Sequence, residues 1–416
     1  MFDRIYRTRL LQDLARWEAA GTLTPETAAA ARAALGPEPR TIGLAGYLVI
    51  AATLLLAGAL LAFVASNWDG IPRLLRLAML VALISGAPAA GAIYAERGNT
   101  LLTDLAMFLG CLAFAASVAL VGQMYHLPEN LAGGFLLCSL GALAAATLSR
   151  STGALAVALV TAVAWSGESQ GQSLRLHWPF LVAWAVAAGV SMRDDKPAAR
   201  HLVAAAAVAW AGVVELAGHR PGLSDATAVI VMLLGCALLA AGSDRKRIAA
   251  FGDILAIYAF FALAGTAFLG SVGPSYWRTP AGPIPGGEIQ HVAMALGLAG
   301  LAIAAAIGRA RALAMTGLAA SAAVLVLNRA PIPNDFRLHG FLALVAALTL
   351  IVGGAYAGRR PVFIAGWIAF ALVVGNLTWF AAPTFLERAV FLALAGGIAV
   401  AAALALRRLE ASRPAP

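Results

Sequence analysis

The chain has 416 residues, of which 61% are hydrophobic and 12% are charged, against ~25% charged residues in soluble domains. A soluble fold of this length cannot bury so much apolar surface, whereas a bilayer accepts about 20 apolar residues per spanning helix. The formal charge of +9 does not indicate a nucleic-acid partner, because the basic residues are spread along the chain in loop-sized groups.

Residues 1–40 are predicted to form a small cytoplasmic amphipathic hairpin of two helices, within residues 2–35. Gly21 breaks the first helix, and Thr24 followed by Pro25 is a typical helix start, with an N-cap side chain and proline at the first helical position. Two roles stay open for the hairpin. It is either a cap lying on the inner membrane surface or a docking element for a cytoplasmic protein partner.

From residue 41 the sequence alternates apolar segments with short polar loops, which predicts an all-α, polytopic bundle of transmembrane helices. About fourteen spans are expected, or twelve if one pair is wrongly assigned. The span at 152–167 is the weakest assignment, because it is short for a membrane-spanning helix. Residues 271–290, rich in Gly and Pro, are expected to form an irregular external loop without a helix. The expected spans are 42–66, 73–95, 101–121, 132–149, 152–167, 178–192, 201–218, 226–243, 248–270, 291–308, 312–328, 338–357, 361–380 and 388–406.

The Lys and Arg residues predict how the spans are oriented. If the N-terminus is cytoplasmic, 21 of the 29 Lys and Arg residues fall in segments on the cytoplasmic side, which is the distribution that the positive-inside rule describes. We therefore expect a multi-pass protein of the bacterial inner membrane with both termini in the cytoplasm. Its natural partners on that side are membrane lipids with anionic headgroups.

Three acidic residues fall within the expected spans and are candidate intramembrane ionisable groups, since a charge inside the membrane is costly and often functional. Asp104 and Asp253 lie about one turn into helices that start at the inner side, where the helix dipole favours a carboxylate. Glu215 lies near the outer end of its span. A role at the helix end and a role in moving protons or ions both remain open.

Two motifs on the expected external side define a candidate polar pocket. The first follows the first span and the second closes the third span, so the topology places both at the same membrane face. Aromatic interfacial belts and turn chemistry are the simpler explanation. The candidate pocket residues are Asn67, Trp68, Asp69, Arg73, Gln123, Tyr125 and His126.

No motif for catalysis, metal or cofactor binding is found. Three cysteines lie in apolar segments without metal-ligand spacing, and neither a phosphate-binding loop nor a nucleophile elbow is present. Five of the six histidines fall at the external side without HxH or HxxxH spacing, so any metal or proton-sensing site there would have to assemble from separate loops. We expect no metal, no cofactor, no nucleic-acid partner and no catalytic residue.

The stretch FVASNWDGIPRLLRLAML, the later VGQMYHL and the preceding G-x-L-T-P-E resemble a bacterial family of polytopic membrane proteins known only as a domain of unknown function. The resemblance covers about residues 1–170. It implies an inner-membrane location and supplies no activity. The expected organisation is therefore the hairpin at 1–40, a family-like membrane region of about five spans at 41–170, and about nine further spans at 171–416.

Three functions remain open. The first is transport or flipping of a small or lipid-linked solute, which the number of spans and the small extramembrane mass favour. The second is a non-catalytic membrane scaffold or sensor whose hairpin docks a cytoplasmic partner. The third is a lipid-modifying membrane enzyme, which the modest external loops favour less, since such enzymes need a sizeable set of external polar groups. Architecture alone does not decide among them.

Overall fold

A computed structural model describes residues 2–34, 55, 70–126, 130–173, 177–193, 196–217, 223–272, 287–308, 310–329, 336–381, 386, 393 and 396–397. Every regular element among these residues is helical, so the expected all-α class is confirmed. The chain divides into two units, residues 1–72 and 73–416, and each is described here by itself.

The N-terminal unit contains the expected helical hairpin. Helix α1 (Phe2–Ala19) ends where Gly21 takes a positive φ of 69°, and α2 (Pro25–Ala34) begins at the expected proline. The amide of Thr22 donates to the carbonyl of Trp17, as in a Schellman motif. The Thr24 hydroxyl accepts from the amide of Thr27 at 3.3 Å, so the expected N-cap is confirmed. An ion pair between Arg32 and Glu18 joins the two helices.

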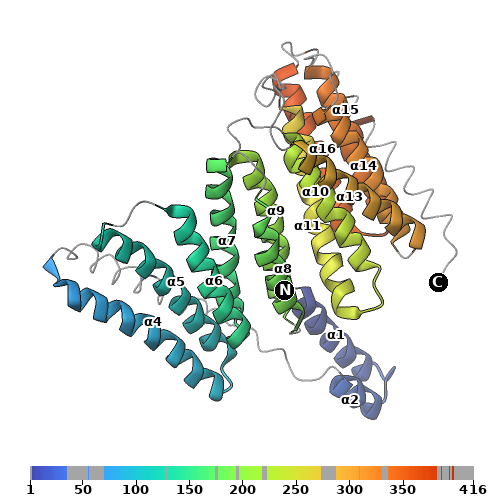
Figure 1. Cartoon of the computed structure of the whole chain (residues 1–416). Helices are drawn as coiled ribbons and strands as arrows, with labels where there is room; N and C mark the ends of the chain where they lie inside the picture. The colour runs from blue at the N-terminus through green and yellow to red at the C-terminus, as the bar shows by residue number, and fades with distance from the viewer. Residues whose placement is uncertain are drawn as a thin grey trace. The chain divides into compact units, whose positions relative to one another are not determined.

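The second unit is a bundle of antiparallel helices (Figure 1). Its first half contains α4 (Arg73–Glu96), α5 (Thr100–Met124), α6 (Leu131–Ser149), α7 (Thr152–Ser173), α8 (Pro179–Arg193) and α9 (Pro197–Ala217). Its second half contains α10 (Leu223–Ala241), α11 (Lys246–Ser271), α13 (Gly287–Ile307), α14 (Arg311–Arg329), α15 (Phe336–Tyr356), α16 (Arg360–Asn376) and a π-helical turn, η2 (Leu377–Ala381).

Eight of the described helices are long and apolar enough to cross a membrane: α4, α5, α6, α9, α11, α14, α15 and α16. Three shorter apolar helical stretches match the expected spans within α8, α10 and α13. The expected spans 42–66 and 388–406 lie largely outside the described residues, so the structure does not establish fourteen spans. Residues 271–290 were expected to contain no helix. That expectation is wrong at both ends, because α11 ends at Ser271 and α13 starts at Gly287.

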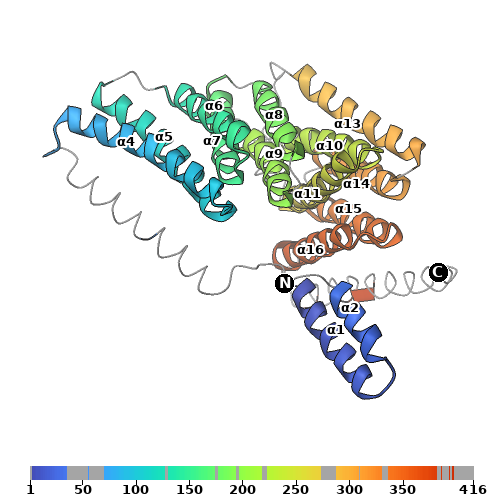
Figure 2. The same cartoon turned by 90° about the horizontal axis from the view of Figure 1, so that it is seen from below.

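The connections between helices differ between the two faces of the bundle. At one face, the pairs α4–α5, α6–α7, α8–α9, α10–α11, α13–α14 and α15–α16 are joined by two to four residues. At the opposite face, five to fifteen residues separate consecutive helices. Seen from below, α11 lies beside α9, α14, α15 and α16 (Figure 2). Helix α11 is therefore the element around which the second half packs.

Helix α16 illustrates how the sequence separates lipid-facing from buried positions. Ile364, Ile368 and Leu372 recur every four residues and are 46–48% exposed, which places them on one stripe of the helix. On the other side, Val362, Ala365, Ala369 and Val373 are almost completely buried. A continuous exposed stripe of large aliphatic side chains is unfavourable in water and suits a hydrocarbon environment.

Small residues, among them Gly297 and Gly300, let the helices approach closely. A side chain at Gly297 would lie 2.6 Å from the backbone of Val231 and Met232 on α10, and Gly300 faces Gly235 on the same helix. Without a hydrophobic driving force between helices in lipid, such close backbone packing is a main source of association. The glycines therefore fix how α13 packs on α10.

Candidate functional site

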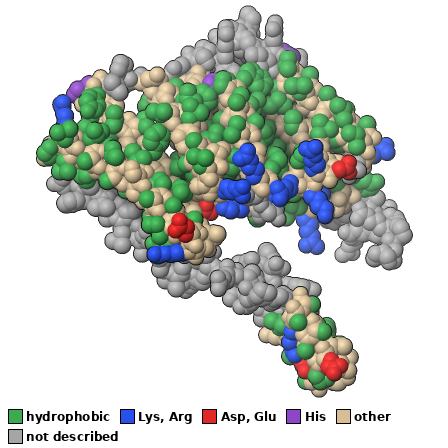
Figure 3. Space-filling view, turned by 60° about the horizontal axis from the view of Figure 1, so that its bottom comes forward, with side chains coloured by type: hydrophobic (Ala, Val, Ile, Leu, Met, Phe, Trp, Pro, Cys, Tyr) green, Lys and Arg blue, Asp and Glu red, His purple; other side chains and the backbone are tan. Residues whose placement is uncertain are grey.

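Most of the described Lys and Arg residues of the second unit lie at the face with the short connections, and we call it the basic face. The connections and helix ends at this face contain Arg97, Arg150, Arg193, Lys196, Arg245, Lys246, Arg247, Arg311, Arg359 and Arg360. Figure 3 shows basic side chains gathered along the edge of a broad apolar surface. Arg73 and Arg76, at the start of α4, lie at the opposite end.

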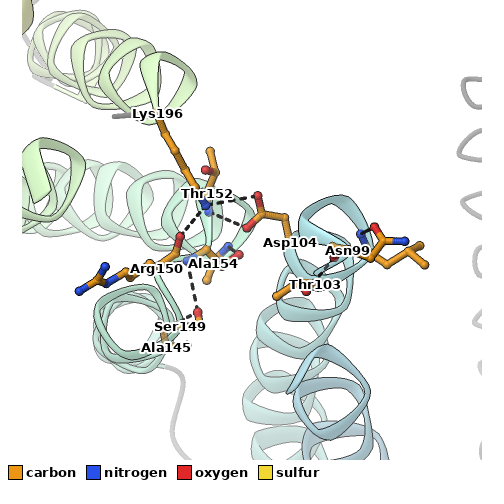
Figure 4. Close-up of polar contacts among 11 residues, drawn as sticks. Asn99, Thr103, Asp104, Ala145, Ser149, Arg150, Thr152, Ala154 and Lys196 are labelled. Carbon is orange, nitrogen blue, oxygen red and sulfur yellow. Dashed lines mark hydrogen bonds and ion pairs between the residues drawn. The ribbon is translucent and has the colours of Figure 1, made fainter. Parts of the chain in front are cut away.

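Asp104 lies at the centre of a polar network at this face (Figure 4). Its Oδ1 accepts a hydrogen bond from the amide of Thr152 at 3.0 Å, and its Oδ2 lies 3.8 Å from Nζ of Lys196. Lys196 also donates to the carbonyl of Arg150 at 2.9 Å. Three segments far apart in sequence, α5, the α6–α7 turn and the start of α9, are thereby joined by one carboxylate and one ammonium group.

The local sequence explains why Asp104 reaches α7. A side chain at Gly153 would lie 2.5 Å from the carbonyl oxygen of Asp104, so only glycine lets α5 and α7 approach this closely. Asp104 accepts from the Thr152 amide, and the hydroxyl of Ser151 accepts from the amide of Ala154. Together they satisfy two of the amides that a helix start leaves without intrahelical partners.

Asp253 takes part in a second contact at the basic face. Its Oδ1 lies 3.0 Å from a guanidinium nitrogen of Arg359, which connects α11 to the start of α16. Arg247 of α11 donates to the carbonyl of Arg193 at 3.0 Å, at the end of α8. The side chains of Asp104 and Asp253 are 29% and 39% exposed and paired with cations. Both lie in the half of the helix that starts at the basic face, beyond its first turn. The choice between a helix-end role and a role in moving protons or ions stays open.

The expected external pocket is only partly within the described residues. Asn67, Trp68 and Asp69 lie outside them. Arg73 at the start of α4 and Gln123 near the end of α5 lie at the same end of two neighbouring antiparallel helices. Gln123, Tyr125 and His126 are exposed. A polar pocket made by these residues stays a prediction.

The expected span 152–167 ends too early. Helix α7 continues to Ser173, so Glu168, which would follow that span in a loop, lies within the helix and is half-buried. Around it, Ser166 is fully buried and accepts from Nε1 of Trp210 at 2.8 Å and from Nε2 of Gln170 at 2.9 Å. The run SGESQGQS interrupts the hydropathy, and hydropathy alone cannot separate a polar helix end from a loop.

Two asparagine contacts, one buried and one partly buried, join helices of the second half toward the opposite face. Nδ2 of Asn376 donates to the carbonyl and the hydroxyl of Ser271 at 2.9 and 3.3 Å. Nδ2 of Asn328 donates to the hydroxyl of Thr227 at 3.0 Å. Asn376 directly precedes η2. Such contacts hold membrane helices together because an unpaired amide is costly in hydrocarbon.

His177, between α7 and α8, contacts Trp165. The two rings lie edge to face with centroids 4.4 Å apart. Burial lowers the pKa of His177 below its ordinary value, because a partly desolvated imidazole favours its neutral form. At neutral pH the side chain therefore packs on Trp165 without charge.

Among the described residues, no group of three His, Cys, Asp or Glu side chains comes together to hold a metal ion. Glu215 belongs to α9, but its side chain lies outside the described part of the chain. The chemistry that the structure places together is thus ion pairing at the basic face and neutral hydrogen bonding inside the bundle.

Residues 15–155 match a family model described as "Predicted membrane protein (DUF2157)". The matched segment is about a third of the chain and runs from within α1 to the start of α7. It lies within the stretch, residues 1–170, for which a membrane family of unknown function was expected. No curated protein and no solved structure matches the chain.

The Asp104 network predicts that three substitutions lower the stability of the protein by different amounts. Asp104→Ala removes the acceptor of the Thr152 amide and should cost about 1–3 kcal/mol of stability. Asp104→Asn keeps an oxygen acceptor but loses the ion pair with Lys196. Lys196→Met also loses this ion pair and leaves the Asp104 acceptor in place. Each of these two substitutions should cost less than about 1 kcal/mol because the pair is partly exposed. Thermal unfolding in detergent measures the loss of stability in each variant and so ranks the three. Equal losses for all three variants would contradict it.

The lowered pKa of His177 predicts that the stability of the protein falls at acidic pH. Because its pKa is lower in the folded state, its contribution to stability is complete above the ordinary value of about 6.5. It is lost as the pH falls through the lower folded-state pKa. The melting temperature of His177→Asn should therefore depend less on pH, between about 7 and 4.5, than that of the wild type.

The matched control for this measurement is His126→Asn, which replaces an exposed histidine at a positive φ of 48° that asparagine tolerates. Its pH profile should follow that of the wild type. A His177→Asn profile identical to both would mean that His177 does not carry the acid sensitivity.

Proposed function

We propose that this chain is a multi-pass protein of the bacterial cytoplasmic membrane, with both termini in the cytoplasm. In this arrangement it acts as a non-catalytic scaffold or sensor, and residues 1–40 dock a cytoplasmic protein partner. The location is supported by the family match of residues 15–155 and by the apolar helices. The orientation is supported by the concentration of Lys and Arg at the basic face.

The observation that favours a scaffold is the state of the acidic residues. A proton- or ion-driven transporter generally places an ionisable group near the middle of the membrane, at a broken helix. Asp104 and Asp253 instead lie toward the basic face and are paired with Lys196 and Arg359. Between the helix ends, the described core of the bundle is built mostly of aliphatic and small residues.

Exposed apolar side chains of the hairpin support a docking role. Leu14 and Ala28 are buried, whereas Leu11 and Trp17 are exposed, Trp17 by 44%. Aromatic side chains are enriched at the centres of protein interfaces. The family model covers part of α1, all of α2 and the helices α4 to α6, which supports a function in which the hairpin and these helices act together.

Transport or flipping of a small or lipid-linked solute is the second candidate, and one observation favours it. Glu168 lies inside α7, two residues along the chain from each of the buried side chains of Ser166 and Gln170. If α7 crosses the membrane, this carboxyl group is a candidate for a substrate or ion path.

Cysteine labelling tests the orientation. In a background without native cysteines, His126→Cys should react with a membrane-impermeant maleimide on intact cells, and Arg360→Cys only after permeabilisation. Both positions are exposed and lie at opposite ends of the bundle. The reverse pattern would overturn the orientation, and labelling of both from one side would overturn the spanning topology.

Photo-crosslinking tests the docking role. A photoreactive amino acid at Trp17 should yield a discrete protein adduct in native membranes, and the same group at Gln12, also exposed on α1, serves as a control for non-specific capture. Adducts to lipid alone at position 17 would instead support a hairpin that lies on the membrane surface. Protein adducts that are identical at both positions would argue against a defined docking face.

A further inference from the structure

Positive charge is distributed unevenly over the basic face. At the ends of α4 to α9, five cations in the sequence, Arg97, Arg150, Arg193, Lys196 and Arg200, stand beside four acids, Glu96, Asp104, Asp194 and Asp195. At the ends of α10 to α16, seven cations, Arg245, Lys246, Arg247, Arg309, Arg311, Arg359 and Arg360, stand beside two acids, Asp244 and Asp253. The positive-inside rule requires basic loops but not this difference between the two halves.

The packing of the helices brings the basic turns of the second half together. Helix α11 contacts α14, α15 and α16, and α14 contacts α15. The turns that carry these charges therefore adjoin one another. Six cations of this group are described and exposed, and we call them the C-terminal basic patch: Arg245, Lys246, Arg247, Arg311, Arg359 and Arg360.

Exposed apolar side chains lie one helical turn from these cations. Met315 follows Arg311 by four residues on α14, and Ile364 follows Arg360 by four residues on α16. Both apolar side chains are about half exposed. Because residues i and i+4 share one face of a helix, each pair presents a cation directly beside a hydrocarbon surface.

A ligand that contacts both the cations and the neighbouring apolar side chains must carry a negative headgroup and apolar chains. A soluble anion would contact the guanidinium groups and leave the apolar stripe bare. The turns at this patch are only three to four residues long, which leaves little protruding structure for a protein partner. We propose that the C-terminal basic patch binds anionic phospholipids, with headgroup phosphates at Arg311 and Arg360 and acyl chains along Met315 and Ile364.

The inference rests on the membrane location proposed above and is tested with the full chain reconstituted in lipid nanodiscs. Wild-type protein in nanodiscs that mix phosphatidylglycerol and phosphatidylcholine should retain the anionic lipid several-fold in preference, as counted by native mass spectrometry. Arg311→Gln/Arg360→Gln should lose most of this preference, whereas Arg311→Lys/Arg360→Lys should keep most of it. Failure of this preference would leave the membrane location intact, because both lipids hold the protein.

The matched control is Arg73→Gln/Arg97→Gln, which removes the same number of charges from positions outside the patch. It should retain the lipid preference of the wild type. An equal loss in this control would mean diffuse attraction by net charge and would overturn the proposal, as would equal retention of both lipids by the wild type. Stabilisation by inorganic phosphate as large as that by phosphatidylglycerol would identify a site for soluble anions and overturn it too.

Discussion

The hydrocarbon core of a bilayer does not accept an unpaired charge or an unsatisfied backbone amide, and this constraint accounts for most of the arrangement described here. It places the ion pairs of Asp104 and Asp253 toward the basic face, where Lys196 and Arg359 reach them. It also accounts for the hydrogen bonds between buried neutral groups, such as Asn376 with Ser271.

The same constraint shapes how the helices pack. Lipid offers no hydrophobic gain for association, so the helices depend on close approach and on hydrogen bonds between them. Gly153 lets α5 come close enough to α7 for Asp104 to cap it, and Gly297 lets α13 lie against the backbone of α10. Glycine thus acts at the contacts where a side chain would separate two helices.

The sequence predicted those features that depend on the residues of one helix or of one turn. The hairpin around Gly21 and Thr24, the apolar helices and the common face of the basic turns are all local consequences of hydropathy and charge. Contacts between distant segments could not be predicted, because nothing in the sequence indicates that Asp104 pairs with Lys196 or Asp253 with Arg359. The end of α7 was predicted wrongly because a polar run at the end of a helix resembles a loop in the sequence. The buried contact that shows the run to be helical and packed, between Trp210 and Ser166, cannot be seen in the sequence.

These features together describe a membrane bundle whose ion pairs Asp104–Lys196 and Asp253–Arg359 lie toward one face, preceded in the chain by a helical hairpin. The most direct test is an experimentally determined structure of the full chain in a lipid bilayer that contains anionic phospholipid. The account predicts that the basic turns lie level with one headgroup layer and that Asp104 and Asp253 keep their cationic partners, with a dry interior between the helix ends. A water-filled cavity that reaches the middle of the bilayer and is lined by Glu168 would contradict it and favour transport.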